Sequence, residues 1–369
     1  MIPLTPLAAT LPETVPFTGP EALERQLGRP FRARLGANES LFGPSPAAKA
    51  AMQAAAADVW MYADPEGYQL KAALAAHHGV ASGNIALGGG IDGLLGLIVR
   101  LMVAPGDAVV TSLGAYPTFN FHVAGHGGVL HGVPYRADLE DPAALLDMAR
   151  RTGARLLYFA NPDNPMGSHH PAGLVADMVA NLPPGCLLVL DEAYADLAPA
   201  GTIPDLPVEH PQVIRLRTFS KGYGMAGARV GYAITHQGLA RAFDKVRDHF
   251  GMGRIAQAGA LAALADQGWL ASVQAQVISA RARVAGIAQD SGLTPLPSAT
   301  NFVTIDCGRD GDHARRVLAC VLARGVFIRM PGVAPLDRCI RVSVGDARSL
   351  SVLAEVLPEA AREATRTGF

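Results

Sequence analysis

Three residues suited to the chemistry of amines and carbonyl groups occur close together in the middle of the chain. Asp191 follows the apolar segment at 186–190, and Tyr194 comes three positions later. Lys221 directly follows the segment VIRLRTFS (213–220) and begins a loop rich in glycine. Ligands bind at the carboxyl ends of strands in open α/β sheets. We therefore expect two strand ends to deliver a carboxylate, a phenol and an amine to one side of a sheet.

Each of these side chains has a use in the chemistry of pyridoxal phosphate. A lysine amine forms an imine with an aldehyde, an aspartate keeps a pyridine nitrogen protonated, and a tyrosine hydroxyl bonds to the phenolic oxygen of the ring. Taken singly, each has a simpler explanation. Lys221 could be a solvated loop lysine, and Asp191 could be a helix cap or an ion-pair partner. The combination is what predicts a cofactor site.

The surrounding pattern predicts that these residues belong to a large α/β domain. Helices are expected at 44–60, with Ser45 as N-cap and Pro46 at the first position, and at 69–80. Short apolar runs then alternate with helical stretches, which is typical of a largely parallel sheet buried on both faces. The expected strands are 107–112, 154–160, 186–194, 213–220 and 228–234.

The pattern changes after about residue 240. Long helices rich in alanine and arginine come first, followed by expected strands at 301–307, 325–330 and 339–345 and a closing helix near 348–364. This block predicts a smaller α+β domain. We expect residues 1–45 to form an N-terminal arm and part of the small domain, 46–262 the large cofactor-binding domain, and 263–369 the small C-terminal domain.

Composition limits the class of protein. The chain has 369 residues, half of them hydrophobic, and a net charge of −1 without runs of lysine or arginine, so a nucleic-acid surface is not expected. Its four cysteines form no CxxC pair and are expected to be reduced thiols. The N-terminus lacks the features of a signal peptide, and no apolar run is long enough to span a membrane. A cytoplasmic protein is the expectation.

Three motifs occur in a fixed order: NPDNPMG at 161–167, DEAY at 191–194 and RTFSKGYGMAGARVGY at 217–232. They strongly resemble the fold-type-I pyridoxal-phosphate aminotransferases of class I/II, in particular the branch that contains histidinol-phosphate aminotransferase. The resemblance extends from RLGANESLFGPSP (34–46) to CIRVSVG (339–345). It implies an aspartate-aminotransferase-like α/β fold, whose large domain has a mostly parallel seven-stranded sheet flanked by helices, beside a smaller α+β domain.

The resemblance also implies roles around the cofactor ring. Lys221 would hold pyridoxal 5′-phosphate as an imine and move protons, and Asp191 would pair with the pyridine nitrogen. Asn164 and Tyr194 would both bond to the phenolic oxygen. Phe119, in AYPTFNFH, falls where relatives stack a tyrosine on the ring, although a phenylalanine of the core would fit the sequence as well.

The cofactor phosphate needs a helix N-terminus and a cation. The segment GGGIDGLLGLIVRLM (88–102) begins a helix with glycines, and relatives often carry Ser or Thr where this chain has Ile91, so that contact would be through the backbone. The residues implied at the phosphate are Gly90, Ile91, Asp92, Thr218, Ser220 and Arg229. Tyr62, in WMYADPEGY, resembles a tyrosine that reaches the phosphate of the neighbouring subunit, which implies a homodimer with shared active sites.

Four residues are implied at the substrate. Arg341 would hold the anionic end of the substrate, and Arg329 corresponds to a second arginine near the substrate phosphate, although a surface strand residue is the alternative. Asn38 would lie at the mouth of the site. The arm of histidinol-phosphate enzymes often carries a tyrosine that reaches the substrate phosphate, and this chain has Phe17 there.

The sequence thus predicts a two-stage transamination between an anionic amino donor, with histidinol phosphate favoured, and 2-oxoglutarate. Transfer from an aromatic or another amino acid, or decarboxylation as in threonine-phosphate decarboxylases, would use the same lysine segment. A nicotinamide-dependent oxidoreductase is a remote alternative, because Gly88, Gly90 and Gly93 satisfy GxGxxG but no acidic residue ends the following strand. Metal binding by His77/His78 or His169/His170 lacks partners at ligand spacing, and no metal is expected.

Overall fold

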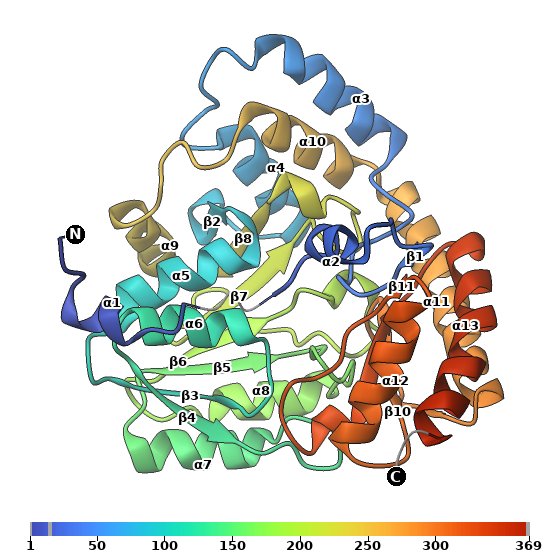
Figure 1. Cartoon of the computed structure of the whole chain (residues 1–369). Coiled ribbons are helices and arrows are strands. Elements are labelled where there is room, and N and C mark those ends of the chain that lie inside the picture. The colour runs from blue at the N-terminus through green and yellow to red at the C-terminus, as the bar shows by residue number, and fades with distance from the viewer. Residues whose placement is uncertain (1, 14–16, 367–369) are drawn as a thin grey trace.

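A seven-stranded sheet organises the larger part of the computed structural model, which describes residues 2–13 and 17–366 (Figure 1). Its order is β2-β8-β7-β6-β5-β3-β4. β8 pairs antiparallel with β2 and β7, and the other described pairs are parallel, so the expected mostly parallel sheet is confirmed. The strands are β2 (Ile85–Gly88), β3 (Ala108–Ser112), β4 (Val129–Val133), β5 (Leu156–Ala160), β6 (Leu187–Asp191), β7 (Val213–Thr218) and β8 (Gly231–Thr235).

Helices cover both faces of this sheet because the strands bury alternate side chains on opposite sides. Tyr158 and Val189 pack on one face with α5 (Gly90–Met102), α6 (Pro117–Gly125) and α9 (Gln237–Ala242). The opposite face is covered near β4 by α7 (Pro142–Thr152) and α8 (Ala172–Ala180), and near β2 by α3 (Pro46–Ala55), α4 (Tyr68–His78) and α10 (Arg254–Ala265).

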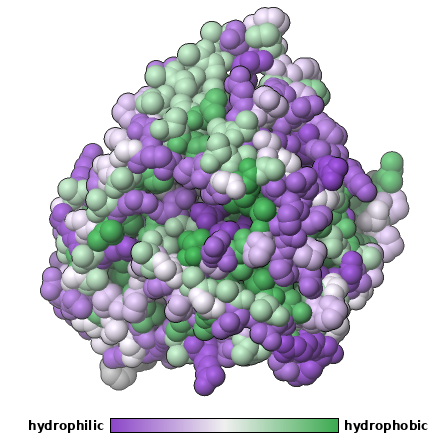
Figure 2. All heavy atoms as spheres, turned by 180° about the vertical axis from the view of Figure 1, so that it is seen from behind, coloured by the Kyte–Doolittle hydropathy of each residue, from purple (hydrophilic) through white to green (hydrophobic). Residues whose placement is uncertain are grey.

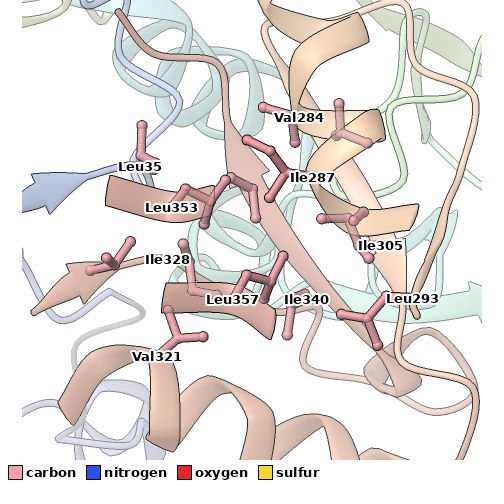
Figure 3. Close-up of a cluster of buried hydrophobic side chains, with 14 of the residues drawn as sticks. Leu35, Val284, Ile287, Leu293, Ile305, Val321, Ile328, Ile340, Leu353 and Leu357 are labelled. Carbon is pink, nitrogen blue, oxygen red and sulfur yellow. The ribbon is translucent and has the colours of Figure 1, made fainter. Parts of the chain in front are cut away.

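A second core lies beside the first (Figure 3). A three-stranded antiparallel sheet packs against long helices, and Leu35, Ile340 and Leu357 lie in its centre. A two-stranded parallel pair joins the beginning of the chain to this part. The elements are α11 (Gln267–Asp290), α12 (Gly311–Ala323), α13 (Ala347–Arg366), β9 (Thr294–Pro295), β10 (Phe302–Asp306), β12 (Cys339–Ser343), β1 (Ala33–Arg34) and β11 (Val326–Phe327). The domain limits expected at residues 45 and 262 stay a prediction.

Local signals set several element boundaries. Ser45 caps α3, its Oγ accepting from the backbone N–H of Ala48 at 3.0 Å, and Pro46 occupies the first helical position as expected. The expected helix at 44–60 was too long, because the α-helix ends at Ala55 and a 3₁₀ turn follows. The N-terminal arm contains two short helices, α1 (Pro6–Thr10) and α2 (Pro20–Leu27).

Among the residues described, no helix is both long and apolar enough to cross a membrane. Figure 2 shows hydrophilic and hydrophobic residues mixed over the back of the molecule. The projection at the top, where α3 lies in Figure 1, is paler and more hydrophobic. It corresponds to the alanine-rich stretch of α3.

Candidate active site

Asp191 is the last residue of β6, at the carboxyl edge of the large sheet. Its side chain is almost fully buried, and each carboxylate oxygen accepts a hydrogen bond. Oδ2 accepts from the hydroxyl of Tyr158 at 2.7 Å, and Oδ1 accepts from the backbone N–H of Ala193 at 2.9 Å. Burial raises the pKa of Asp191, and the hydrogen bond from Tyr158 opposes that shift. The carboxylate is therefore held in one orientation.

Lys221 lies three residues after the end of β7. Its Nζ donates to the backbone carbonyl of Asn38 at 2.9 Å and lies 5.6 Å from the centre of the Tyr194 ring. Burial, together with the positive charge of Arg341, lowers the pKa of Lys221 to about 8. Near neutral pH a useful fraction of this amine is unprotonated and nucleophilic, unlike that of a solvated lysine.

The loop that carries Lys221 is packed closely against the segment before α3. Gly224 has a φ of +69°, and a Cβ there would lie 2.3 Å from the backbone carbon of Gly43. Only glycine both adopts this positive φ readily and leaves room for the backbone of Gly43. Asp191 and Lys221 are thus fixed by strand ends and by a tight loop contact, rather than by flexible segments.

Asn38 connects several parts of the site. Its Nδ2 donates to the hydroxyl of Tyr194 at 3.1 Å, and Ser343 Oγ donates to its Oδ1 at 3.1 Å. Its carbonyl accepts from both Lys221 and Asn301. The expectation of a position at the mouth of the site was wrong, because Asn38 is buried among these partners. Burial raises the pKa of Tyr194, which keeps the phenol protonated.

Arg341 lies on β12 and reaches the same centre from the second core. Its Nη1 donates to Oδ1 of Asn164, and its guanidinium carbon lies 5.2 Å from the centre of the Phe302 ring. A β-bridge places Arg329 beside it, with two backbone hydrogen bonds between the arginines. Burial lowers the pKa of Arg341 to about 10, and the charge of Arg329 adds to that shift. The two guanidinium groups form a strongly cationic end of the site.

Both arginines retain unused donors. Nε of Arg329 and Nε of Arg341 are buried and have no hydrogen-bond partner within the part of the chain that the structure describes. Buried donors without partners are costly and point to a ligand that completes them.

The N-terminal arm contacts this cationic end. The guanidinium carbon of Arg329 lies 4.9 Å from the centre of the Phe17 ring, and its Nη2 donates to the carbonyl of Thr18 at 3.0 Å. Phe17 also stacks on Tyr116, with ring centres 6.1 Å apart. Arg329 is half-buried beneath these contacts and is therefore more than a surface strand residue.

The structure corrects the assignment of Phe119. Its side chain has no exposed surface and stacks on Tyr158 at 4.7 Å, so no face remains for a cofactor ring. Tyr116 is better placed, because it lies between the arm and the helix α6. Burial raises its pKa, and the negative charges of Asp92 and Asp191 add to that shift. The signal that could have identified it is Pro117, which begins α6 and leaves the preceding residue in the loop at the strand end.

A second polar group lies at the start of α5. Thr218 Oγ1 donates to Ser220 Oγ at 2.9 Å, and Arg229 reaches Ser220 Oγ at 3.4 Å and the carbonyl of Gly89 at 3.3 Å. Gly90 has a φ of +77°, and a Cβ there would lie 2.4 Å from the Arg229 guanidinium. Hydroxyls, a cation and the first N–H groups of a helix thus share one place, which suits a phosphate.

The side chains of the two residues after Gly90 point elsewhere. The side chain of Ile91 is buried in the core between α5 and the sheet. Asp92 Oδ1 lies 3.1 Å from Nε2 of His122. Only their backbone N–H groups are available to an anion. Tyr62 is also apart from this group: it is 79% exposed, and its ring packs on Phe250 at 4.7 Å.

The donor set fits pyridoxal phosphate. The partly buried amine of Lys221 suits the aldehyde, the ionisable Asp191 suits a ring nitrogen, and the cluster at Arg229 suits the phosphate. Tyr194 and Asn164 supply neutral polar groups between them, each already in contact with Asn38 or Arg341. The fold and this arrangement together define a fold-type-I pyridoxal-phosphate enzyme.

Comparison with known proteins agrees with this class. The family model for aminotransferase class I and II matches residues 33–357. Histidinol-phosphate aminotransferase 1 of Mesorhizobium japonicum is 37% identical over 85% of this chain and 86% of its own length. The crystal structure of histidinol-phosphate aminotransferase from Sinorhizobium meliloti in complex with pyridoxal-5′-phosphate is 55% identical, covers 98% of both chains and has a TM-score of 0.95. A Thermus thermophilus aspartate aminotransferase mutant at 20% identity and a TM-score of 0.81 supports the fold alone.

The chain belongs to the class I and II aminotransferase family, in the branch similar to histidinol-phosphate aminotransferases. It is a pyridoxal-phosphate-dependent aminotransferase. The prediction of reaction class and cofactor is confirmed, and the nicotinamide alternative is wrong.

Proposed function

We propose that this enzyme transfers the amino group of a phosphorylated donor, histidinol phosphate in the first place, to 2-oxoglutarate in the cytoplasm. The observation that carries the proposal is the pair Arg329 and Arg341, bridged side by side and each with a buried Nε that lacks a partner in the described structure. Two adjacent guanidinium groups suit a doubly charged phosphate better than a single carboxylate. The relatives' names agree with this donor.

Pyridoxal phosphate, when bound, supplies an aldehyde that condenses with amines and a ring that withdraws electrons. In our proposal Lys221 attaches it, and Asp191 pairs with the ring nitrogen. Tyr116 would stack on the ring, and Asn164 and Tyr194 would bond to its phenolic oxygen. The phosphate is held by Thr218, Ser220, Arg229 and the backbone N–H groups of Gly90, Ile91 and Asp92.

Lys221 then has a second task as the proton carrier. Nζ, when it is not attached to the cofactor, would take the proton from the donor's α-carbon and hold it for return to the product. A free amine with a pKa near 8 is suited to both steps, because it is neither fully protonated nor strongly basic at neutral pH. The contact between Nζ and the carbonyl of Asn38 keeps the amine in place while it is free.

An aromatic amino donor is the second candidate. The observation that favours it is the aromatic wall formed by Phe17 and Tyr116, which could contact a phenyl or phenol ring. Such a donor would carry only its α-carboxylate to Arg341 and would leave Arg329 without a ligand. A decarboxylating reaction would use the same lysine, and its product would distinguish it.

We also propose a homodimer with shared active sites. Tyr62 lies in an exposed apolar region with Val59, Trp60, Tyr68 and Phe250, all more than half exposed in the single chain. A patch of that kind points to a partner surface. In a dimer Tyr62 would reach the partner's phosphate site. Mixed dimers of Lys221→Ala and Tyr62→Ala chains should regain part of the activity that each variant lacks, whereas a fully active monomer in light scattering would refute the shared site.

The donor is tested by kinetics with 2-oxoglutarate as acceptor. With histidinol phosphate, Arg329→Ala should lower kcat/KM at least tenfold, because it removes a charged hydrogen bond worth about 1.5–3 kcal/mol. With phenylalanine the same variant should change kcat/KM little, which makes that donor the internal control. If phenylalanine or tyrosine is a better donor than histidinol phosphate for the unmodified enzyme, the phosphate assignment is wrong. Release of carbon dioxide and an amine from a phosphorylated amino acid, without conversion of 2-oxoglutarate to glutamate, would replace transamination by decarboxylation.

A further inference from the structure

We propose that Tyr158 is a positioning residue for the reaction: its hydroxyl holds Asp191 ionised and aimed at the cofactor's ring nitrogen. The proposal rests on the function proposed above for Asp191, and it adds a residue that none of the three motifs contains. Its basis is the contact between two buried side chains on neighbouring strands, Tyr158 Oη to Asp191 Oδ2 at 2.7 Å.

The sheet register explains why these two side chains meet. Ala160 is the partner of Asp191 in the parallel pair of β5 and β6, and Val189 is the partner of Tyr158. These two pairs are two positions apart along the strands, so Tyr158 and Asp191 point to the same face of the sheet. A tyrosine is long enough to span that diagonal and deliver its hydroxyl to the end of β6, where a phenylalanine would leave the oxygen without that donor.

The ring of Tyr158 is itself fixed. Phe119 of α6 stacks on it with 4.7 Å between ring centres and 21° between ring planes, and neither residue has exposed surface. This contact gives Phe119 a use that does not require contact with the cofactor. Burial raises the pKa of the Tyr158 phenol strongly, so the hydroxyl stays protonated and donates.

No other side chain among the residues described donates a hydrogen bond to Asp191 in place of the Tyr158 hydroxyl. Its other oxygen accepts from the backbone N–H of Ala193. The charged groups that influence it are Glu192, which is paired with Arg215 and Arg217, and Lys221 across the site. Around Tyr158 the titratable groups are Asp191, Glu140 and Tyr116. Each carboxylate oxygen accepts more than one hydrogen bond, so the contact with Tyr158 leaves room for a ring nitrogen.

Removing the hydroxyl should make the Asp191 carboxylate more basic, because burial would then be opposed by one hydrogen bond fewer. The shared proton would move from the ring nitrogen towards Asp191. A ring that carries less positive charge withdraws electrons less well, so removal of the α-proton slows. Binding of the donor's anionic end at Arg329 and Arg341 should not change.

The test is Tyr158→Phe, which removes one oxygen and keeps the shape. Tyr232→Phe is the matched control, because Tyr232 is equally buried and its hydroxyl lies 2.9 Å from Nε2 of His78 rather than against Asp191. For each holoenzyme the visible absorption of the bound cofactor is titrated with pH, and kcat and KM are measured separately. Thermal unfolding of the cofactor-free proteins shows how much stability each change removes.

We expect Tyr158→Phe to raise the pH midpoint of the absorption change and to lower kcat by roughly ten- to a hundredfold, the range of a hydrogen bond to a charged group. KM should stay within about twofold if the donor site is untouched. Tyr232→Phe should lose similar stability without a change in the midpoint. A deaza analogue of the cofactor, which lacks the ring nitrogen, should show no difference between Tyr158→Phe and the unmodified enzyme.

Two failures are distinguishable. If Asp191→Asn leaves the absorption midpoint unchanged, the proposed role of Asp191 is wrong. If Asp191→Asn shifts the midpoint and Tyr158→Phe does not, Tyr158 is only a packing residue and the present inference is wrong. Should Tyr158→Phe unfold, Phe119→Leu, which loosens the Tyr158 ring without touching its hydroxyl, must shift the midpoint in the same direction, and an unchanged midpoint would also reject the inference.

Discussion

The two ends of the active site are built differently. At the cofactor end Asp191 and Tyr194 are buried and Lys221 is partly buried, and their polar atoms already have protein partners. At the substrate end Arg329 is held by the faces of aromatic rings and by one backbone carbonyl, and buried Nε donors are left unpaired among the residues described. The first end is preorganised, and the second is incomplete until a ligand binds.

The difference follows from the elements that supply each end. β5, β6 and β7 lie in the middle of a seven-stranded sheet, with a neighbour on each side. The arginines come from β12 and from the residues just after the two-residue strand β11, and the arm contributes Phe17. Central strands fix a side chain closely, whereas an arm held by a few surface contacts can adapt to a substrate.

The largest effect should come from the cofactor end. Lys221→Ala should lower turnover by at least about four orders of magnitude, because it removes both the attachment point and the proton carrier. Borohydride should no longer fix the cofactor to the protein, as judged by mass spectrometry of the peptide that contains residue 221. Lys245→Ala is the control, since Lys245 is exposed. Substantial turnover by Lys221→Ala would show that another group moves the proton.

Arg341 tests whether the two ends are separable. It contributes to the substrate end, yet its Nη1 donates to Asn164 beside the cofactor. Arg341→Gln should lower kcat/KM for every anionic donor by about a hundredfold, since loss of one partner of a buried charge pair costs roughly 2–5 kcal/mol. It should also shift the cofactor's absorption spectrum, whereas Arg329→Ala should not. An unchanged spectrum in Arg341→Gln would make the division between the ends sharper than the structure suggests.

The reactivity of Lys221 should depend on pH in a way that an exposed lysine does not. Burial lowers its pKa to about 8, so the neutral fraction rises with pH, about tenfold per unit, up to about pH 8 and then levels off. Acylation of Lys221 in the cofactor-free enzyme should follow that curve in mass spectrometry. A free lysine derivative with a blocked α-amine, added to the same sample, serves as the reference, and its labelling should continue to rise above pH 9 because the ordinary pKa of a lysine amine is about 10.4. A rise at Lys221 that continued beyond pH 9 would contradict the lowered pKa.

The cofactor end could be predicted from sequence better than the substrate end. Asp191 ends β6 and Lys221 follows β7, and because parallel strands end at the same edge of a sheet, their position on one side could be predicted. The positions of Asn38 and Tyr116 could not be predicted from the sequence pattern. Asn38 is placed by contacts with Ser343 and Asn301, about 300 and 260 positions away, and no local pattern encodes such a contact.

The prediction that Phe119 contacts the cofactor ring was wrong for a related reason. Tyr116 and Phe119 are three positions apart at the start of one helix, and sequence alone shows two aromatic residues that could each face the cofactor. The structure distinguishes the two residues, because Phe119 is fully buried in the core whereas Tyr116 precedes the helix. The hydrogen bond of Tyr158 likewise could not be predicted from the apolar run LLYFA, because the partner of its hydroxyl lies on the neighbouring strand β6.

The smallest effect should come from the arm. Phe17 is 38% exposed and contacts Arg329 through its ring face, an interaction worth about 0.5–1 kcal/mol at exposed sites. Phe17→Leu keeps an apolar side chain but removes that face, so KM for a phosphorylated donor should rise about two- to fivefold. Because Phe17 does not contact Lys221 or Asp191, kcat and the absorption spectrum should be unchanged. Phe17→Trp restores an aromatic face and should restore KM, which separates the cation–π contact from simple coverage of the site. An equal rise in KM for both variants would mean that the shape of the arm matters and that its contact with the guanidinium does not.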